Sequence, residues 1–257
     1  MFLPIRDDNP HTATPFVNYG LIAACVAVFL WQFSLGDAGD AAVMVFGLIP
    51  GHLFGTVAPD PALPIMPALL TVFSSMFLHG GWMHLGGNML YLWVFGDNIE
   101  ASLGHGRYLV FYLLCGVAAA LAQSIAAPTS DVPMVGASGA IAGVLGAYLV
   151  LHPRSNIKVF VFLIVIITFI NIPAFIVLGI WFVAQLMSSA AADPNAPGVA
   201  FLAHIGGFVA GAVLVFFFKK RSVVVFEPAH SRAFAVEKRP LRRRGSVPEV
   251  RRGNPWN

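Results

Sequence analysis

Long apolar runs separated by shorter polar stretches dominate the chain. A helix needs roughly 20 mostly apolar residues to cross the hydrocarbon core of a bilayer. Six runs have about this length, at residues 16–33, 82–99, 108–127, 135–151, 172–190 and 199–218. The pattern therefore predicts an all-α membrane protein with six transmembrane helices, which we number as spans one to six.

The stretch 157–173 is also apolar but does not fit this count. Joined to span five, it would make a run of more than roughly 30 residues, longer than one crossing needs. Asn171 and Pro173 interrupt the run, and proline removes a backbone donor and disfavours a continuous helix. We expect an interfacial or short re-entrant piece here, ahead of the true span.

Composition excludes an ordinary soluble protein. Hydrophobic residues make up 58% of the 257 residues, charged residues only 11%, and the mean hydropathy is +0.78. Soluble domains carry roughly 25% charged residues. Cys25 and Cys115 both lie inside apolar runs, so we expect packing residues there, not a disulfide.

Charge predicts the orientation in the membrane. All 15 Lys and Arg residues lie before span one, between spans two and three, between spans four and five, or after span six. The positive-inside rule then places both termini in the cytoplasm. Residues 1–15, which show no signal or transit pattern, are expected to be a cytoplasmic segment. Short loops and this missing pattern favour a multi-pass protein of the bacterial inner membrane.

Two segments outside the spans have unusual compositions. The loop of residues 34–81 is apolar and rich in Gly and Pro, so we expect it to lie partly in the outer leaflet. Residues 219–257 are strongly basic with several prolines, which indicates a disordered cytoplasmic tail that touches anionic lipid. Residues 16–218 would form the functional domain. We expect membrane lipid and no nucleic acid as a partner, and the oligomeric state stays open.

Polar side chains inside the spans are the candidates for chemistry, because each is costly in lipid. Ser138 begins span four, His204 lies early in span six, and His84 and Asn88 lie early in span two. All three spans run inward from the outer side, so the four groups lie within about 10 Å of the outer boundary. His84 and Asn88, four residues apart, share one helix face.

These groups fit acyl-transfer chemistry. A serine hydroxyl becomes a nucleophile when a base takes its proton, and His204 is the candidate base for Ser138. Asp97 and Glu100 end span two on the cytoplasmic side, so no carboxylate in a span lies at this depth. A Ser–His dyad is therefore simpler than a triad, although Asp131 in a loop is an alternative orienting group. Unpaired amide groups at the start of span four and the side chains of His84 and Asn88 would bind the oxyanion. This chemistry needs no cofactor and no metal.

Small residues beside Ser138 have a second explanation. Gly136 would allow a tight turn and close approach of a substrate. The pairs Gly139–Gly143 and Gly207–Gly211 match the small-xxx-small pattern that packs membrane helices. Each pattern alone favours packing, but four polar groups at one depth are hard to explain that way. We expect the glycines to bring spans four and six together and so Ser138 and His204 within reach.

Three stretches resemble the signatures of rhomboid intramembrane serine proteases: HGGWMHLGGN at 79–88, GASG at 136–139 and AHIGGFVAG at 203–211. The resemblance covers roughly residues 15–218 and implies a six-helix rhomboid-like bundle. It implies Ser138 as nucleophile, His204 as base, His84 and Asn88 as oxyanion donors, and His79 as a structural or water-organising residue. A structural carboxylate is implied at Glu100. Ala142 departs from the family, many of whose members have an aromatic residue there against the catalytic histidine.

The resemblance implies cleavage of transmembrane protein substrates near the outer face, with access between spans two and five. Phe175, Trp181 and Phe182 would line that gate or simply contact lipid. Three alternatives stay open. A zinc site of His79, His84 and His204 lacks the HExxH pattern and an activating glutamate. A transporter would place its site near mid-membrane. A catalytically inactive rhomboid-like protein would bind transmembrane clients without cutting them.

Overall fold

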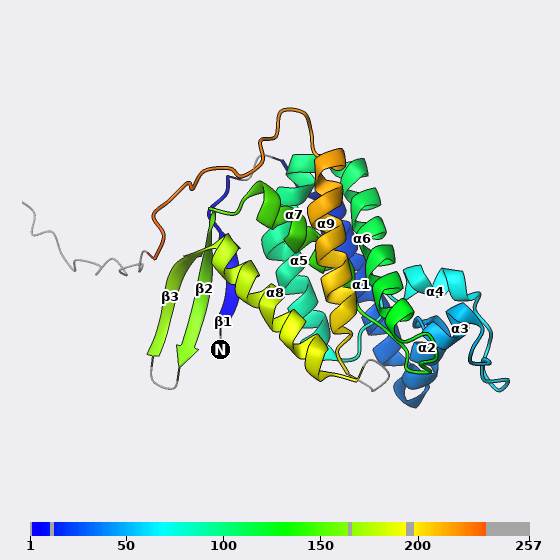
Figure 1. Cartoon of the computed structure of the whole chain (residues 1–257). Helices are drawn as coiled ribbons and strands as arrows, with labels where there is room; N and C mark the ends of the chain where they lie inside the picture. Colours follow the sequence, from blue (N-terminus) through cyan, green and yellow to red (C-terminus); the bar gives the residue numbers. More distant parts are fainter. Residues whose placement is uncertain (1, 11–12, 164–165, 194–197, 235–257) are drawn as a thin grey trace, which may run out of the picture.

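The computed structural model describes residues 2–10, 13–163, 166–193 and 198–234. Within these residues, six long helices form a bundle (Figure 1). Each begins and ends within four residues of an apolar run that the sequence singles out. The six are α1 Phe16–Ser34, α5 Trp82–Leu103, α6 His105–Ala126, α7 Ser138–Leu151, α8 Ala174–Ala191 and α9 Phe201–Phe218.

The helices have the composition of an integral membrane protein. By length and apolarity, α1, α6, α8 and α9 are each able to cross a membrane. Helix α7 is apolar but has only 14 residues, and α5 has 22 residues but carries polar groups such as His84, Asn88 and Glu100. The structure is thus a mostly helical membrane protein, and the count of six spans stays a prediction.

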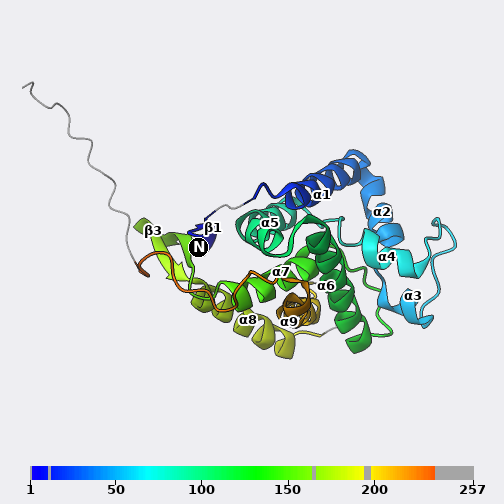
Figure 2. The same ribbon diagram turned by 90° about the horizontal axis from the view of Figure 1, so that it is seen from above.

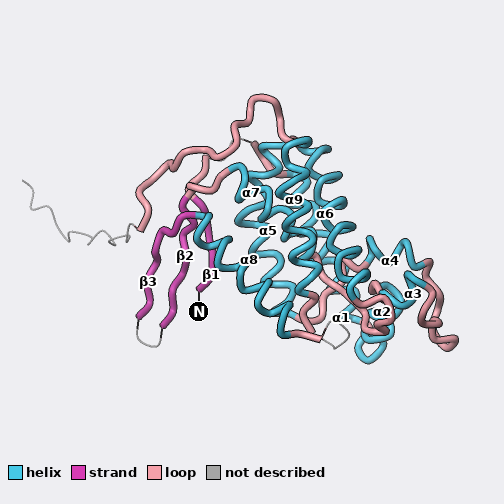
Figure 3. Tube along the Cα trace, viewed as in Figure 1, coloured by secondary structure: helices cyan, strands magenta, loops and turns pink. Residues whose placement is uncertain are grey.

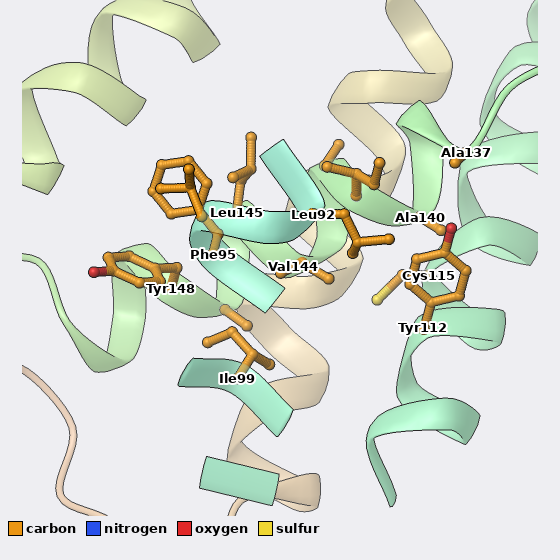
Figure 4. Close-up of a cluster of buried hydrophobic side chains, with 14 of the residues drawn as sticks. Leu92, Phe95, Ile99, Tyr112, Cys115, Ala137, Ala140, Val144, Leu145 and Tyr148 are labelled. Atoms are coloured by element: carbon orange, nitrogen blue, oxygen red, sulfur yellow. The ribbon is translucent and has the colours of Figure 1, made fainter. Parts of the chain in front are cut away.

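Helix α7 lies in the middle of the bundle, surrounded by α5, α6, α8 and α9 (Figure 2). Every residue from Gly139 to Tyr148 is buried. Figure 4 shows part of this core, in which side chains of α5 and α6 pack against α7. Cys25 and Cys115 are buried free thiols, as expected for packing residues.

Glycines let α7 and α9 approach until their backbones touch. A Cβ atom added to Gly207 would collide with the carbonyl oxygen of Gly139, and one added to Gly211 would collide with that of Gly143. Gly146 meets the carbonyl oxygen of Phe208 in the same way. The predicted close packing of spans four and six is confirmed, and we call this contact the glycine seam.

A three-stranded antiparallel sheet adds to the helices, in the order β1 (Phe2–Asp7), β2 (Asn156–Leu163), β3 (Ile166–Pro173). The stretch 157–173, where we expect an interfacial or short re-entrant piece, supplies the paired strands β2 and β3, and its position relative to the membrane stays a prediction. Both strands are rich in β-branched Ile and Val, which favour strands. Pairing with β1, from the expected cytoplasmic segment 1–15, gives β2 backbone partners on both sides.

The sheet lies to one side of the bundle, next to α8 (Figures 1 and 3). Strand β1 contacts α5, while β2 and β3 contact α8. Ile157, Val159 and Val161 are buried at alternate positions of β2, so one face of the sheet packs inward. The sheet therefore links α5 to α8, two helices on either side of α7.

The loop after α1 folds into the short helices η1 (Gly36–Ala38), α2 (Gly39–Phe46), α3 (Pro50–Phe54) and α4 (Ala68–Ser74). Large apolar side chains point outward there, including Ile65 at 74% and Leu69 at 73% exposure. Such exposure fits contact with lipid. The location of this loop in the outer leaflet stays a prediction.

The chain after α9 differs from the disordered tail expected from residue 219. Hydrogen bonds hold it to the bundle: Phe226 N–H donates to the Val150 carbonyl, and Glu227 N–H to that of Leu151. The Glu227 carboxylate also lies 2.6 Å from Nδ1 of His152. The basic residues between 235 and 257 lie outside the described residues.

Glu100 joins α5 to the start of α1. Its carboxylate is buried and accepts hydrogen bonds from the amides of Val17, at 3.0 Å, and Asn18, at 2.7 Å. Those amides belong to the first turn of α1, where no intrahelical acceptor is available and negative charge is favoured. His105 contacts the same carboxylate at 2.5 Å. Glu100 therefore has the surroundings of a structural carboxylate, as the resemblance implies for it.

Candidate active site

Ser138 is the first residue of α7 and follows a constrained turn. Gly136 has a φ of +124°, a conformation that residues with a side chain rarely adopt. A Cβ atom there would also lie only 2.8 Å from the imidazole of His84. The turn is anchored by the Gly136 amide, which donates to the Ser75 carbonyl at 2.8 Å. Glycine at 136 thus allows the turn that leads into Ser138 and leaves room for the His84 imidazole beside it.

His204 lies in the first turn of α9, next to Ser138 across the glycine seam. Its Nε2 is 2.8 Å from the Ser138 Oγ, a hydrogen-bond distance. This is the contact that a general base and its nucleophile need. The structure thus brings together the serine and histidine that the sequence pairs.

A third polar group, from α8, contacts the histidine. The side-chain oxygen of Gln185 lies 2.7 Å from Nδ1 of His204. The ring of Trp181, one turn earlier on α8, lies 5.9 Å from the imidazole between centroids. An aromatic neighbour of the histidine thus comes from α8, whereas Ala142 of α7 carries no aromatic ring. Sequence reasoning missed Gln185, although a glutamine inside an apolar span is costly and so was a detectable signal.

Hydrogen-bond donors gather beside Gly136. The Gly80 amide donates to Nδ1 of His84 at 3.2 Å, so the proton of a neutral His84 is on Nε2, the nitrogen near Gly136. Nδ2 of Asn88 is buried and has no hydrogen-bond partner among the described residues. The amide of Ser138, at the start of α7, has no acceptor within its own helix. These three donors belong to the residues predicted for the oxyanion site, and that role stays a prediction.

His79 lies behind the site. It is fully buried, and its Nδ1 is 3.2 Å from the Phe77 carbonyl. Its backbone is held by Gln32 of α1, which contacts both the carbonyl and the amide of His79. The imidazole packs edge-on against His84 at 5.3 Å. Its Nε2 is buried and has no hydrogen-bond partner among the described residues, so both the structural and the water-organising role stay predictions.

The polar groups open into a cavity of about 670 Å³. Its walls include Ser138, His204, His84, Asn88 and Trp181, together with glycines and apolar side chains. Asp131 lines a different cavity, so it does not stand where an orienting group for His204 would. The Nδ1 position is instead next to Gln185.

The aromatic residues expected at a gate on α8 have different surroundings. Trp181 lines the cavity, and Phe182 stacks on Phe208 of α9 with ring centroids 4.5 Å apart. Phe175 is 51% exposed near the start of α8, far along the helix from the site. Of the three, Trp181 alone faces the candidate site.

Comparison with known proteins gives a consistent match. The family model described as the Rhomboid domain matches residues 67–221. The chain is 33% identical over 162 residues to Rhomboid protein 1, mitochondrial, of Saccharomyces cerevisiae, covering 59% of this chain and 42% of that protein. It is 32% identical over 147 residues to Rhomboid protease GluP of Bacillus subtilis, covering 57% and 26%. Rhomboid protease GlpG of Klebsiella pneumoniae is 29% identical over 113 residues, covering 44% and 36%.

The chain therefore spans less than half the length of each of these three relatives. The region that matches the family model, residues 67–221, includes Ser138, His204, His84, Asn88 and His79.

Proposed function

The chain belongs to the rhomboid family, and from this premise we propose that it is an intramembrane serine endopeptidase with Ser138 as nucleophile and His204 as general base. The observation that carries the proposal is the 2.8 Å contact between the Ser138 hydroxyl and Nε2 of His204, inside a cavity. The printed names of GluP and GlpG are those of proteases, which supports the same chemistry. Neither group needs a metal or cofactor for this reaction.

The reaction has two halves. In the first, the Ser138 oxygen attacks the scissile carbonyl carbon while Nε2 of His204 takes the hydroxyl proton. The C–N bond then breaks, His204 gives that proton to the leaving amine, and an ester to Ser138 remains. In the second half, His204 takes a proton from water, hydroxide attacks the ester, and the proton returns to Ser138. The cavity supplies the path along which water reaches Ser138.

Negative charge on the carbonyl oxygen would be stabilised by the donors beside Gly136. The amide of Ser138, Nδ2 of Asn88 and Nε2 of His84 surround this position from α7 and α5. The unpartnered amide group of Asn88 supports such a role, because a buried donor without an acceptor is costly unless function requires it.

The substrate would be a transmembrane protein with a locally unwound helix. A helix hides its carbonyl groups in internal hydrogen bonds, so the cut segment must be extended before Ser138 can attack. Small residues at the cut and a Gly or Pro nearby would favour this unwinding. The substrate would approach between α5 and α8, which border the cavity on two sides.

The site would lie toward the outer face, with both termini in the cytoplasm of a bacterial cell. His204 is 14 residues from Phe218, the end of α9, which places it about 21 Å from the basic segment that follows. The Lys and Arg residues mark that opposite end as the cytoplasmic one. Both features support cleavage near the outer boundary.

Proteolysis in liposomes tests the proposal. Purified protein would be reconstituted with a single-span substrate that carries a fluorophore on each side of the membrane. We expect cleavage by the wild type and by Ser188→Ala, a control on α8 outside the cavity, and none by Ser138→Ala or His204→Ala. Equal cleavage by Ser138→Ala would refute the assignment. Binding of the substrate without cleavage by any of the four proteins would instead identify a client-binding protein.

A further inference from the structure

We propose that Gln185 is a positioning residue that fixes the proton of His204 on Nδ1 and makes the activity of the base depend on where α8 lies. The inference rests on the proposed function and extends the Ser138–His204 dyad by a neutral third member. Helix α8, at the edge of the bundle, would then help to prepare His204 for proton transfer.

The contact determines which nitrogen of His204 carries the proton. An amide oxygen only accepts hydrogen bonds, so Oε1 of Gln185, 2.7 Å from Nδ1, requires a proton on that nitrogen. In neutral imidazole the other nitrogen, Nε2, then has its lone pair free to accept from the Ser138 hydroxyl. This is the tautomer that a general base needs. The opposite tautomer would donate to Ser138 and be unable to take its proton.

A neutral orienting group suits this location. A carboxylate in this role would place a charge inside an apolar span, which is costly. The amide of Gln185 supplies an acceptor without that charge. Its depth also fits, because Gln185 lies six residues before the end of α8 and His204 three residues after the start of α9, within about 5 Å of each other along the helix axes.

Helix α8 is held less firmly than the helices that carry the dyad. Among its residues, all of which the structure describes, Ala174 and Leu178 alone are buried, and both lie in its first two turns. Beyond them, Ile180 and Met187 are 68% and 70% exposed. Phe182 stacks on Phe208 of α9, and the neighbouring ring of Trp181 lies 6.0 Å from Phe208 between centroids. In contrast, Ser138 and His204 lie on α7 and α9, locked together by the glycine seam.

Outward movement of the second half of α8 would therefore separate Gln185 from His204 and leave Ser138 and His204 in contact. The imidazole would then lose the acceptor that selects its tautomer. The base is set for catalysis when α8 is docked, so a substrate that displaces α8 must let it return before the bond is cut. Such coupling of closure to chemistry is a known route to selectivity in enzymes.

Kinetics on substitutions at 185 test the positioning role. Gln185→Leu keeps the size but removes the acceptor, whereas Gln185→Glu keeps an acceptor oxygen. Met187→Leu, on the exposed face of α8, is the matched control. We expect Gln185→Leu to lower kcat by about 10- to 100-fold, the range for loss of a group that orients a functional histidine, with little change in KM. Gln185→Glu restores an acceptor at the cost of a charge in the span and should be more active than Gln185→Leu, and the control should match wild type. A kcat of Gln185→Leu within twofold of wild type would overturn the proposal.

The histidine tautomer gives a readout that a loss of packing would not change. In protein with ¹⁵N-labelled histidine, the His204 signals, assigned by comparison with His204→Ala, should show the proton on Nδ1 in wild type. Gln185→Leu should lose this preference. A proton on Nε2 in wild type, or an unchanged tautomer in Gln185→Leu, would overturn the proposal. If no protein cuts substrate but the tautomer responds as expected, the proteolytic function fails and the positioning of His204 by Gln185 stands.

Coupling to α8 is tested from a distance by Phe182→Ala. This change removes the ring stacked on Phe208 without touching His204 or Gln185. We expect it to shift the His204 tautomer in the same direction as Gln185→Leu and to lower kcat. A wild-type tautomer in Phe182→Ala would refute the dependence on α8 docking.

Discussion

Asp7→Asn should make the stability of the protein less dependent on pH. Asp7 in β1 is buried, and its Oδ2 accepts hydrogen bonds from Asn9, Asn98 and the Tyr148 hydroxyl at 3.0, 2.7 and 2.6 Å. Burial raises the pKa of the Asp7 carboxyl from 3.8 to about 6, against the lowering effect of the Tyr148 hydrogen bond; the nearby Asp97 charge raises it further. The neutral acid therefore persists to higher pH in the folded protein than in the unfolded chain.

The sign and size of the effect follow from this pKa. Because the folded pKa is above the unfolded one, the neutral carboxyl stabilises the fold fully below pH 3.8, and the contribution is lost as pH rises through about 6. The full difference is worth about 3 kcal/mol. Between pH 5 and pH 8, wild type should lose about 1.4 kcal/mol through this group, or roughly 3–6 °C in Tm. The asparagine side chain of the Asp7→Asn variant would keep the oxygen acceptor and lose this dependence.

Thermal melts in detergent at pH 5 and pH 8, followed by tryptophan fluorescence, would measure the effect. Burial lowers the pKa of His152 despite the opposing effect of Glu227, so that histidine contributes a pH dependence of the opposite sign. It is present in both proteins and cancels in their difference. Asp37→Asn, at an exposed carboxylate, is the control and should behave like wild type. Equal pH dependence in wild type and Asp7→Asn would refute the reasoning.

Three further predictions concern the helices and the site. Gly207→Val should prevent the contact of α7 with α9, because the valine side chain would meet the Gly139 carbonyl. We expect it to lower the free energy of unfolding by about 1–3 kcal/mol or more and to abolish cleavage. A stable, active Gly207→Val protein would contradict the glycine seam. Glu100→Ala should lower the free energy of unfolding by about 3 kcal/mol in denaturation experiments. The reason is that two backbone amides of α1, and the side chain of His105, lose their partner. A Tm equal to that of wild type would count against this role. Asn88→Ala should lower kcat by about 100-fold with an unchanged Tm, because one donor of the oxyanion site is lost; unchanged kcat would remove Asn88 from that site.

The helices and the dyad could be predicted because each leaves a strong local pattern. Apolar length fixes a span to within a few residues, as for α1 and α9. The glycine pairs of spans four and six indicated which helices touch, and that contact brings Ser138 and His204 to 2.8 Å. The distance of a residue from the end of its helix follows from its number, at about 1.5 Å per residue. Ser138, His204, His84 and Asn88 could therefore be assigned to one depth in the membrane.

The sheet was missed for a different physical reason. An apolar run of β-branched residues such as 157–173 suits a buried strand as well as a membrane helix, and periodicity does not separate the two. Its partner β1 is about 150 residues away in sequence, and pairing over that distance leaves no local trace. Gln185 was not predicted because the third group beside a Ser–His pair is expected to be a carboxylate. The side chain at this position is a neutral amide. Which residue it contacts depends on how α8 is rotated about its axis, and the sequence does not give that rotation.

Covalent labelling tests the central claim most directly, because it needs no knowledge of the natural substrate. A fluorophosphonate probe reacts with a serine whose hydroxyl is activated by a base, and mass spectrometry of the digested protein locates the adduct. We predict one adduct on Ser138 in wild type and a strongly reduced yield in His204→Ala. Absence of an adduct on Ser138, or the same yield without the imidazole, would contradict the activation of this serine by its neighbour on α9.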